Sequence, residues 1–179
     1  MTATVTVRPF RWWDVAAVRR IEEDLFPEDP WSVEMFWSEL ADIPASRFYL
    51  VADMPASANG EAREAGEANE PGKPPHHTVA GYAGLMTQPA PTPGRTEGWV
   101  QNIAVAREYQ GRGLGTVLLT ALLDEAARRN CSEVWLEVRT DNDSAQRLYT
   151  RFGFESAGIR RGYYQPGNHD ALIMRKALQ

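Results

Sequence analysis

The sequence predicts one α/β (α+β) domain in which a mixed, mostly antiparallel sheet of six to seven strands is flanked by about four helices. Two observations indicate this class. Short apolar strands alternate with amphipathic helical segments, and their order is strand, two helices, three strands, helix, strand, helix and two strands. A chain of 179 residues is also long enough for one domain with its own core. We therefore expect residues 1–179 to form a single domain.

The first half of the chain begins with a strand and two helices. Thr4–Pro9 alternates apolar and polar residues, as a half-buried strand does. A helix with one mostly apolar face then runs from Trp12 until Pro27 interrupts it. The next helix has Ser32 as its N-cap and ends before Pro44.

Two strands, Phe48–Ala52 and Thr78–Thr87, enclose the segment Asp53–His77. This segment consists largely of Ala, Glu, Gly, Asn and Pro and lacks apolar periodicity, so it cannot bury enough surface to offset its ordering entropy. We expect a flexible insertion without a role in activity, although a length beyond ~15 residues leaves a regulatory or docking role open.

The second half predicts the remaining elements from periodicity and turn residues. They are the strand Trp99–Val105, the amphipathic helix Leu114–Arg129, the strand Val134–Val138, the helix Ser144–Arg151, and the strands Phe154–Ile159 and Ala171–Arg175 around a Gly162–Asp170 loop.

Composition excludes several classes of protein. Apolar residues make up 43% and charged residues 24%, which is typical of a globular domain. No apolar run approaches the ~20 residues of a membrane span, and Met1–Arg11 lacks the apolar stretch of a signal peptide, so we expect a cytoplasmic protein. The net charge of −5 disfavours nucleic-acid binding and suits a basic peptide partner.

Cysteine and histidine usage argues against a metal centre. The only cysteine, Cys131, has no base beside it in sequence, which favours a small buried residue over a nucleophile. His76, His77 and His169 lack metal-ligand spacing, so we expect no metal site.

The strongest local motif is the segment 110–116, Gln-Gly-Arg-Gly-Leu-Gly-Thr, between a strand and an amphipathic helix. Its glycines permit positive φ and expose amides at the positive end of a helix, where a pyrophosphate can bind. No Gly-Lys-Ser/Thr follows, and Thr116 replaces the third glycine of a dinucleotide fingerprint, so P-loop and NAD enzymes lose support. A glycine-rich loop alone, however, also fits a plain tight turn.

The motif matches Q/R-x-x-G-x-G/A, the pyrophosphate loop of GNAT acetyltransferases, with Gln110, Gly113 and Gly115 at the defining positions. From about Val100 to Met174 the chain resembles the bacterial ribosomal-protein alanine N-acetyltransferases (RimI type) of that family. The matching segments are Trp135–Arg139, Asn142, Ala145, Leu148-Tyr149, Gly153-Phe154, Arg160–Tyr164 and Asp170–Met174.

The first half resembles that family more loosely. The family's Phe-Pro-Trp-Ser motif corresponds here to Phe26-Pro27 and Trp31-Ser32, with Glu28–Pro30 inserted between them. The segment 53–77 has no counterpart in the shorter members of that family. The resemblance implies a GNAT fold that binds acetyl-CoA as co-substrate.

By the same resemblance, a backbone amide in the strand Trp99–Val105 polarises the thioester, and this strand carries a splay or bulge. Arg112 adds positive charge near the pyrophosphate, and Asn142 hydrogen-bonds the pantetheine amide. The full set of expected cofactor-binding residues is Ile103, Ala104, Val105, Gln110, Gly111, Arg112, Gly113, Leu114, Gly115, Thr116 and Asn142.

Glu137 and Tyr149 are the expected catalytic pair. Glu137 is a carboxylate in an otherwise apolar strand, where burial costs free energy unless the group has a partner or a task. The resemblance makes it the general base; the alternative is a structural ion pair with Arg139 or another cation. The resemblance makes Tyr149 the general acid, and Leu148 already supplies an apolar anchor, which favours chemistry over core packing.

The implied reaction is direct attack by an α-amine, whose pKa near ~8 suits a carboxylate base better than a lysine near ~10.4. The implied acceptor is the N-terminal Ala of the eighteenth small-subunit ribosomal protein. A lysine, another protein N-terminus or a small amine remains an alternative acceptor, and a non-catalytic CoA-binding subunit is a third alternative.

Overall fold

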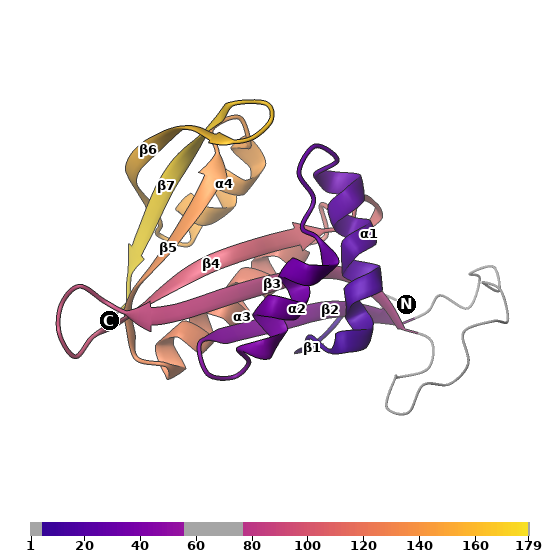
Figure 1. Cartoon of the computed structure of the whole chain (residues 1–179), viewed down its shortest axis with the longest axis horizontal. Helices are drawn as coiled ribbons and strands as arrows, with labels where there is room; N and C mark the ends of the chain where they lie inside the picture. Colours follow the sequence, from indigo (N-terminus) through magenta and orange to yellow (C-terminus); the bar gives the residue numbers. More distant parts are fainter. Residues whose placement is uncertain (1–4, 56–76, 179) are drawn as a thin grey trace, which may run out of the picture.

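The computed structural model describes residues 5–55 and 77–178, and within them the elements follow the predicted order. In chain order they are β1 (Thr6–Pro9), the 3-10 turn η1 (Trp12–Asp14), α1 (Val15–Leu25), α2 (Val33–Ala41), β2 (Arg47–Pro55), β3 (His77–Pro89), β4 (Thr96–Val105), the 3-10 turn η2 (Arg107–Tyr109), α3 (Leu114–Arg128), β5 (Cys131–Arg139), α4 (Asp143–Arg151), β6 (Glu155–Tyr164) and β7 (His169–Ala177). Figure 1 shows this course.

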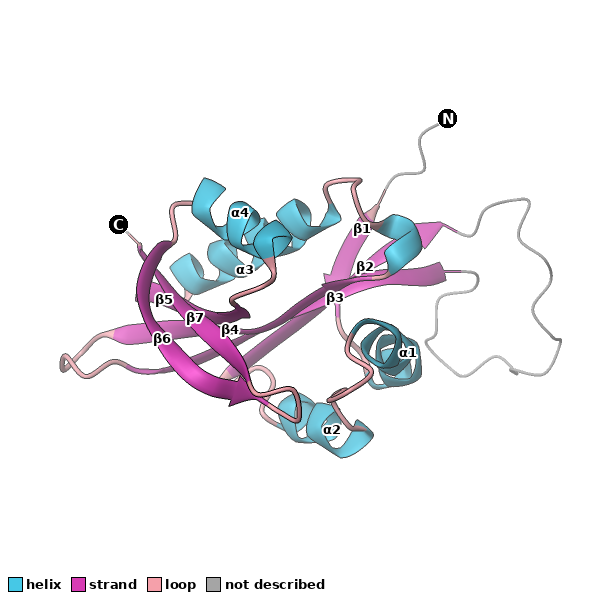
Figure 2. Ribbon diagram, turned by 90° about the horizontal axis from the view of Figure 1, so that it is seen from above, coloured by secondary structure: helices cyan, strands magenta, loops and turns pink. Residues whose placement is uncertain are grey.

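The strands form one sheet in the order β1-β2-β3-β4-β5-β7-β6. Neighbouring strands are antiparallel except β4 and β5, which are parallel. The helices α1 and α2 lie on one face of the sheet, and α3 and α4 lie on the other (Figure 2). This arrangement confirms the predicted mixed sheet with helices on both sides. In the described ranges, no helix is long and apolar enough to cross a membrane.

Each face of the sheet has its own apolar core. On the α3 face, Leu118, Leu119 and Leu122 pack with Leu85 and Val134. On the opposite face, which we call the α1/α2 face, the core is richer in aromatic residues: Phe10, Phe36, Tyr49 and Tyr82 pack with Val18 and Ile21. The sheet therefore has no solvated face along β2 and β3, which fixes the register of both strands.

Local sequence explains where the helices begin. The Ser32 hydroxyl accepts a hydrogen bond from the amide of Met35 at 3.3 Å, so Ser32 is the N-cap of α2 as predicted. α1 ends at Leu25, just before Pro27. Cys131 is a buried residue at the start of β5, as its isolation in the sequence indicated.

Several strands are longer than predicted, so two expected segments between strands are too long. The expected insertion 53–77 begins too early, because β2 continues to Pro55, and Asp53 is buried there with Arg8 bonded to its carboxylate at 2.5 Å. The rest of that insertion, residues 56–76, lies outside the described residues. The expected loop 162–170 is also too long, because β6 continues to Tyr164 and pairs there with His169 at the start of β7.

The strands β4 and β5 pair over only part of their length. Their register ends at Trp99↔Trp135, although β4 continues to Val105 and β5 to Arg139, and the two strands visibly separate (Figures 1 and 2). The two indole rings stack at this point, with centroids 5.7 Å apart.

A register shift between β3 and β4 leaves Gln101 as a bulge residue. The predicted bulge and splay of this strand are both confirmed.

Candidate active site

The glycine motif forms the start of α3. Gly111 and Gly113 have φ of 71° and 81°, and Gly113 is the N-cap of the helix. The first intrahelical bond runs from the amide of Val117 to the carbonyl of Gly113 at 3.1 Å, so the amides of residues 114–116 precede the helical hydrogen-bond ladder. A Cβ at either glycine would meet no atom within 4 Å. The helix therefore presents its positive end to open space, which suits an anion.

The two long side chains of the motif, Gln110 and Arg112, contact the end of β4 and the turn η2. Gln110 Nε2 donates to the carbonyl of Val105 at 2.9 Å, which fastens the loop to the end of β4. The Arg112 guanidinium lies 5.4 Å from the centroid of the Tyr109 ring and is exposed. Arg112 thus provides a solvated positive charge beside the helix start.

At the end of β4, some backbone amides and carbonyls point toward β5, with which this part of β4 does not pair. The amide of Ala106 donates to Ala80 in β3 at 2.9 Å. Because backbone groups alternate in direction along an antiparallel strand, those of Ala104 point the same way as Ala106, whereas those of Ile103 and Val105 point toward the β5 side. Of the three predicted backbone contacts, Ile103 and Val105 are therefore the residues oriented to meet an extended ligand between the strands.

Asn142 has a structural role that the sequence did not predict. Its Oδ1 accepts a hydrogen bond from the amide of Ala145 at 3.1 Å, so it is the N-cap of α4. This cap places the start of α4 just after β5, at the end of the strand that carries Glu137.

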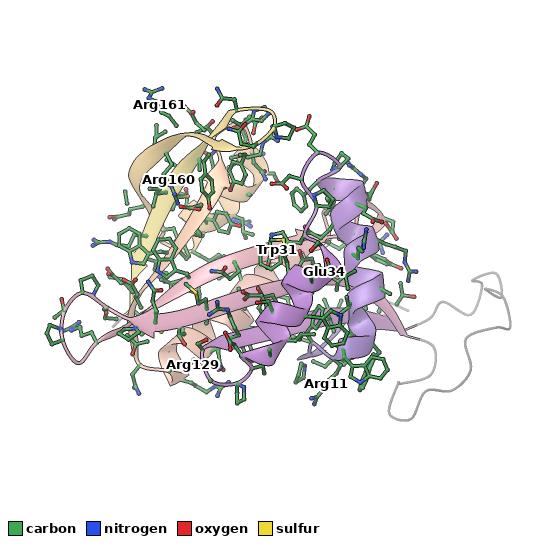
Figure 3. The ribbon with its side chains drawn as sticks, in the orientation of Figure 1. Arg11, Trp31, Glu34, Arg129, Arg160 and Arg161 are labelled. Atoms are coloured by element: carbon green, nitrogen blue, oxygen red, sulfur yellow. The ribbon has the colours of Figure 1, made fainter. Side chains whose placement is uncertain are left out.

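Glu137 is bonded to a cation that comes from another strand. Arg160 Nη1 on β6 lies 2.5 Å from Glu137 Oε1, and the Glu137 side chain is 15% exposed. Arg139, which the sequence offered as a partner, is instead bonded to Asp141 at 2.7 Å. Figure 3 shows Arg160 and Arg161 on β6, with Arg161 extending beyond the ribbon. The Glu137 carboxylate is thus paired with a guanidinium that is itself half-exposed.

Tyr149 lies deeper than the sequence indicated. The residue is 7% exposed, belongs to the core on the α3 face and packs edge-on against Phe154, with ring centroids 5.9 Å apart. Core packing is therefore part of its role, contrary to the prediction that Leu148 would suffice as the anchor. Burial raises the pKa of Tyr149 to about 12, so the hydroxyl holds its proton at neutral pH.

Two further tyrosines, Tyr163 and Tyr164, surround Glu137, and the sequence interpretation gave them no role. A hydrogen bond to Glu137, followed by burial, raises the pKa of Tyr163, whose ring also lies 4.2 Å beneath the Arg160 guanidinium. Burial, and then the charge of Glu137, raises the pKa of Tyr164. Their signal in the sequence is the Arg-Arg-Gly-Tyr-Tyr segment at 160–164, which resembles the family and whose last three residues belong to the expected loop 162–170.

The site is made of backbone amides and of the carboxylate and phenol side chains described above. In the described part of the chain, no three His, Cys, Asp or Glu side chains gather as metal ligands do. What the fold brings together is an anion-binding helix start, outward-facing strand amides, a carboxylate and protonated phenols. Such a combination is typical of transferases that use an extended, phosphate-bearing donor.

Comparison with known proteins identifies the class. The family model described as "Acetyltransferase (GNAT) family" matches residues 15–154. The chain is 36% identical over 176 residues to a protein of Mycobacterium tuberculosis named N-alpha-acetyltransferase RimI, and the alignment covers 98% of this chain and 94% of that protein. The chain therefore belongs to the GNAT acetyltransferase family and is an acyltransferase.

Solved structures agree with this assignment. The crystal structure of the ribosomal-protein-S18-alanine N-acetyltransferase from Escherichia coli superposes with a TM-score of 0.71 at 30% identity, covering 98% of this chain and 95% of that one. Arabidopsis thaliana NAA60 in complex with acetyl-CoA superposes with a TM-score of 0.75, covering 98% and 99% of the two chains, at 18% identity. The second similarity concerns the fold alone.

Proposed function

We propose that this protein transfers the acetyl group of acetyl-CoA to the α-amino group of the N-terminal Ala of ribosomal protein bS18. The observation that carries the proposal is the position of Glu137 beside the separation of β4 and β5, where a donor held by the start of α3 would present its thioester. The names of the relatives from Mycobacterium tuberculosis and Escherichia coli support N-terminal acetylation, and the second supports this acceptor.

The donor is held mainly by backbone groups. The amides that follow Gly111 and Gly113 bind the pyrophosphate, helped by the charge of Arg112. The pantetheine arm extends along β4 in the manner of an added strand, bonded by Ile103 and Val105 and by the side chain of Asn142. The thioester oxygen accepts a hydrogen bond from a β4 amide at the bulge, which stabilises the negative charge that develops there.

The reaction is a direct attack in which atoms and protons balance. The neutral α-amine bonds through its nitrogen to the thioester carbonyl carbon to form a tetrahedral intermediate, and Glu137 accepts one proton from that nitrogen and later releases it to solvent. The carbon–sulfur bond then breaks, and the thiolate of CoA takes the proton of Tyr149. The products are the acetamide and free CoA, and Tyr149 is reprotonated from solvent.

The proposal is tested with purified protein, acetyl-CoA and three peptides from the bS18 N-terminus: the free Ala peptide, the same peptide with a blocked α-amine and free lysine, and a peptide with Ala replaced by Lys. Mass spectrometry should show one acetyl group on the free Ala peptide and none on the blocked one. Acetylation of the blocked peptide would identify a lysine acetyltransferase instead. Comparison of ribosomal proteins from cells with and without the gene gives the physiological acceptor.

A further inference from the structure

A chain of polar side chains crosses the α1/α2 face of the sheet and ends beside the site. Tyr49 on β2 lies with its hydroxyl 2.9 Å from Glu39 Oε2 on α2 and 3.3 Å from Asn102 Oδ1 on β4. Arg47 Nε donates to the same oxygen of Glu39 at 2.6 Å. The Tyr49 ring passes directly over Gly84 of β3, where a Cβ would come within 2.2 Å of it. The absence of a side chain at Gly84 is what allows Tyr49 to reach β4.

The single proton of the Tyr49 hydroxyl determines the direction of the hydrogen bonds among these side chains. A tyrosine hydroxyl has one proton, so it can donate to Glu39 or to Asn102 but not to both. The carboxylate is closer and is the stronger acceptor. Burial, and then the charge and hydrogen bond of Glu39, raises the pKa of Tyr49, so the proton remains on the hydroxyl. The hydroxyl oxygen is then an acceptor toward Asn102.

The amide of Asn102 must therefore turn its nitrogen to Tyr49. Rotation of the amide by half a turn exchanges Oδ1 and Nδ2 at nearly the same positions, so Nδ2 then donates to the Tyr49 oxygen. The carbonyl oxygen Oδ1 faces away from Tyr49. The Asn102 Oδ1 atom is therefore a hydrogen-bond acceptor of fixed direction, because Tyr49 on β2 orients Asn102 on β4 and Glu39 on α2 orients Tyr49.

Asn102 lies on the same face as Glu137. Trp99 and Trp135 stack on one face, and Glu137 follows Trp135 by two residues, which returns it to that face. The bulge at Gln101 adds one residue between Trp99 and Asn102, so Asn102 also returns to the face of Trp99. Both side chains project from parts of β4 and β5 beyond their last paired residues, Trp99↔Trp135.

We propose that Asn102 binds the attacking amino group through Oδ1, from the β4 side, while Glu137 receives its proton from the β5 side. Tyr49 and Glu39 are positioning residues that act through Asn102. An amine has more than one N–H, so it can donate to both residues, and its lone pair is then directed by two contacts rather than one. This assignment rests on the proposed function, because it concerns the same attacking amine.

Steady-state kinetics of three variants test the assignment with the acceptor that the wild type acetylates. Asn102→Ala should raise the KM for the acceptor about five- to tenfold, as expected for loss of one hydrogen bond, and Tyr49→Phe should raise it about threefold. The KM for acetyl-CoA should not change. In the double variant, the effect of Tyr49→Phe should disappear, because its role depends on Asn102.

Independent, multiplying effects of the two substitutions, or an unchanged KM for the acceptor in both, would overturn the assignment. A second readout does not depend on turnover. In nuclear magnetic resonance spectra, the Asn102 side-chain amide protons should show contacts to the Tyr49 ring that are lost in Asn102→Asp. If these protons point away from Tyr49, the assignment is wrong even when acetylation of the Ala peptide, and with it the proposed function, is confirmed.

Discussion

Arg160 Nη1 lies 2.5 Å from Glu137 Oε1, so the proposed base has a cationic partner on the strand β6 before any amine arrives. Arg160 is 53% exposed and also rests on the Tyr163 ring. An exposed ion pair of this kind is weak and therefore displaceable. In the proposed reaction, an incoming α-ammonium would compete with the guanidinium for the same carboxylate.

Arg160→Met should therefore lower the KM for the acceptor peptide by about two- to fivefold, because an exposed ion pair contributes little and no counter-ion must be displaced. Arg161→Met is the matched control, since Arg161 is 87% exposed and 3.6 Å from Asp170 rather than bonded to Glu137. Steady-state kinetics over peptide concentration give both values. A higher KM in Arg160→Met would mean that Arg160 binds the acceptor itself.

Glu137→Gln should lower turnover by about 10²–10⁴-fold, the usual scale for loss of a general base, and should leave acetyl-CoA affinity unchanged. Glu133→Gln is the control on the same strand, because Glu133 also pairs with an arginine, Arg175, at 3.5 Å. Turnover numbers and calorimetric titration with acetyl-CoA provide the comparison. Near-wild-type turnover of Glu137→Gln would require another base.

The raised pKa of Tyr149, about 12, should determine how turnover depends on alkaline pH if Tyr149 is the acid. The hydroxyl is protonated below its pKa, so turnover should not decline between pH 8 and pH 10, where an ordinary tyrosine near ~10 begins to ionise. Tyr149→Phe should lower turnover across this range. Circular dichroism at each pH checks that the fold is intact, and a decline near pH 9 without unfolding would contradict the assignment of Tyr149 as the acid.

Gly113→Asp should weaken acetyl-CoA binding more than Gly113→Asn does. Both side chains tolerate the positive φ of 81° at this position better than most, and both enter open space, so they differ mainly in charge. A carboxylate beside the pyrophosphate site should cost about tenfold more in affinity than the amide, because it opposes the positive end of α3. Calorimetric titration measures the difference, and equal affinities would place the pyrophosphate elsewhere.

Glu22 of α1 should make stability depend on pH in a defined direction. The residue is 2% exposed and accepts hydrogen bonds from the Tyr82 hydroxyl and, at 3.1 Å, from the amide of Trp31. Burial raises its pKa above 4.5, so the folded state keeps this proton to a higher pH than the unfolded chain does. The contribution of the group to stability is therefore greatest in acid and is lost as pH rises through the raised pKa.

Relative to Glu22→Gln, which does not titrate, the wild type should lose stability as pH increases from 4.5, with a slope of up to about 1.4 kcal/mol per pH unit. Urea unfolding at several pH values measures the free energy of unfolding for both proteins. Glu23→Gln is the control, because Glu23 is exposed and pairs with Arg19. A difference that does not vary with pH would show that Glu22 titrates as in the unfolded chain.

The sequence predicted features that depend on neighbours along the chain. Glycines at positive φ, the Ser32 cap and the periodic face of α3 are local, and their positions could be predicted. The end of β2 could not, because Asp53 is buried only where Arg8, forty-five residues earlier, supplies a cation. The sequence offered Arg139 or another cation as the partner of Glu137, and it could not single out Arg160, which the pairing of β6 with β7 brings close.

The contact between Tyr49 and Asn102 could not be predicted either, because it depends on the pairing of three strands and on a glycine in the middle strand. No spacing in the sequence relates residue 49 to residue 102. The segment 56–76 stays a prediction, because it lies outside the described residues.

Four residue pairs, Thr96↔Cys131 to Trp99↔Trp135, are the whole strand-to-strand junction between β1–β4 and β5–β7 in the described sheet. The helix α3 spans this junction by packing on both sides of it. Because β4 and β5 share so few pairs, we expect backbone amides beyond Trp99 and Trp135 to exchange faster than those in the paired part of the sheet. A donor bound between β4 and β5 would add hydrogen bonds to both strands there, so binding should slow amide exchange in this part of the sheet.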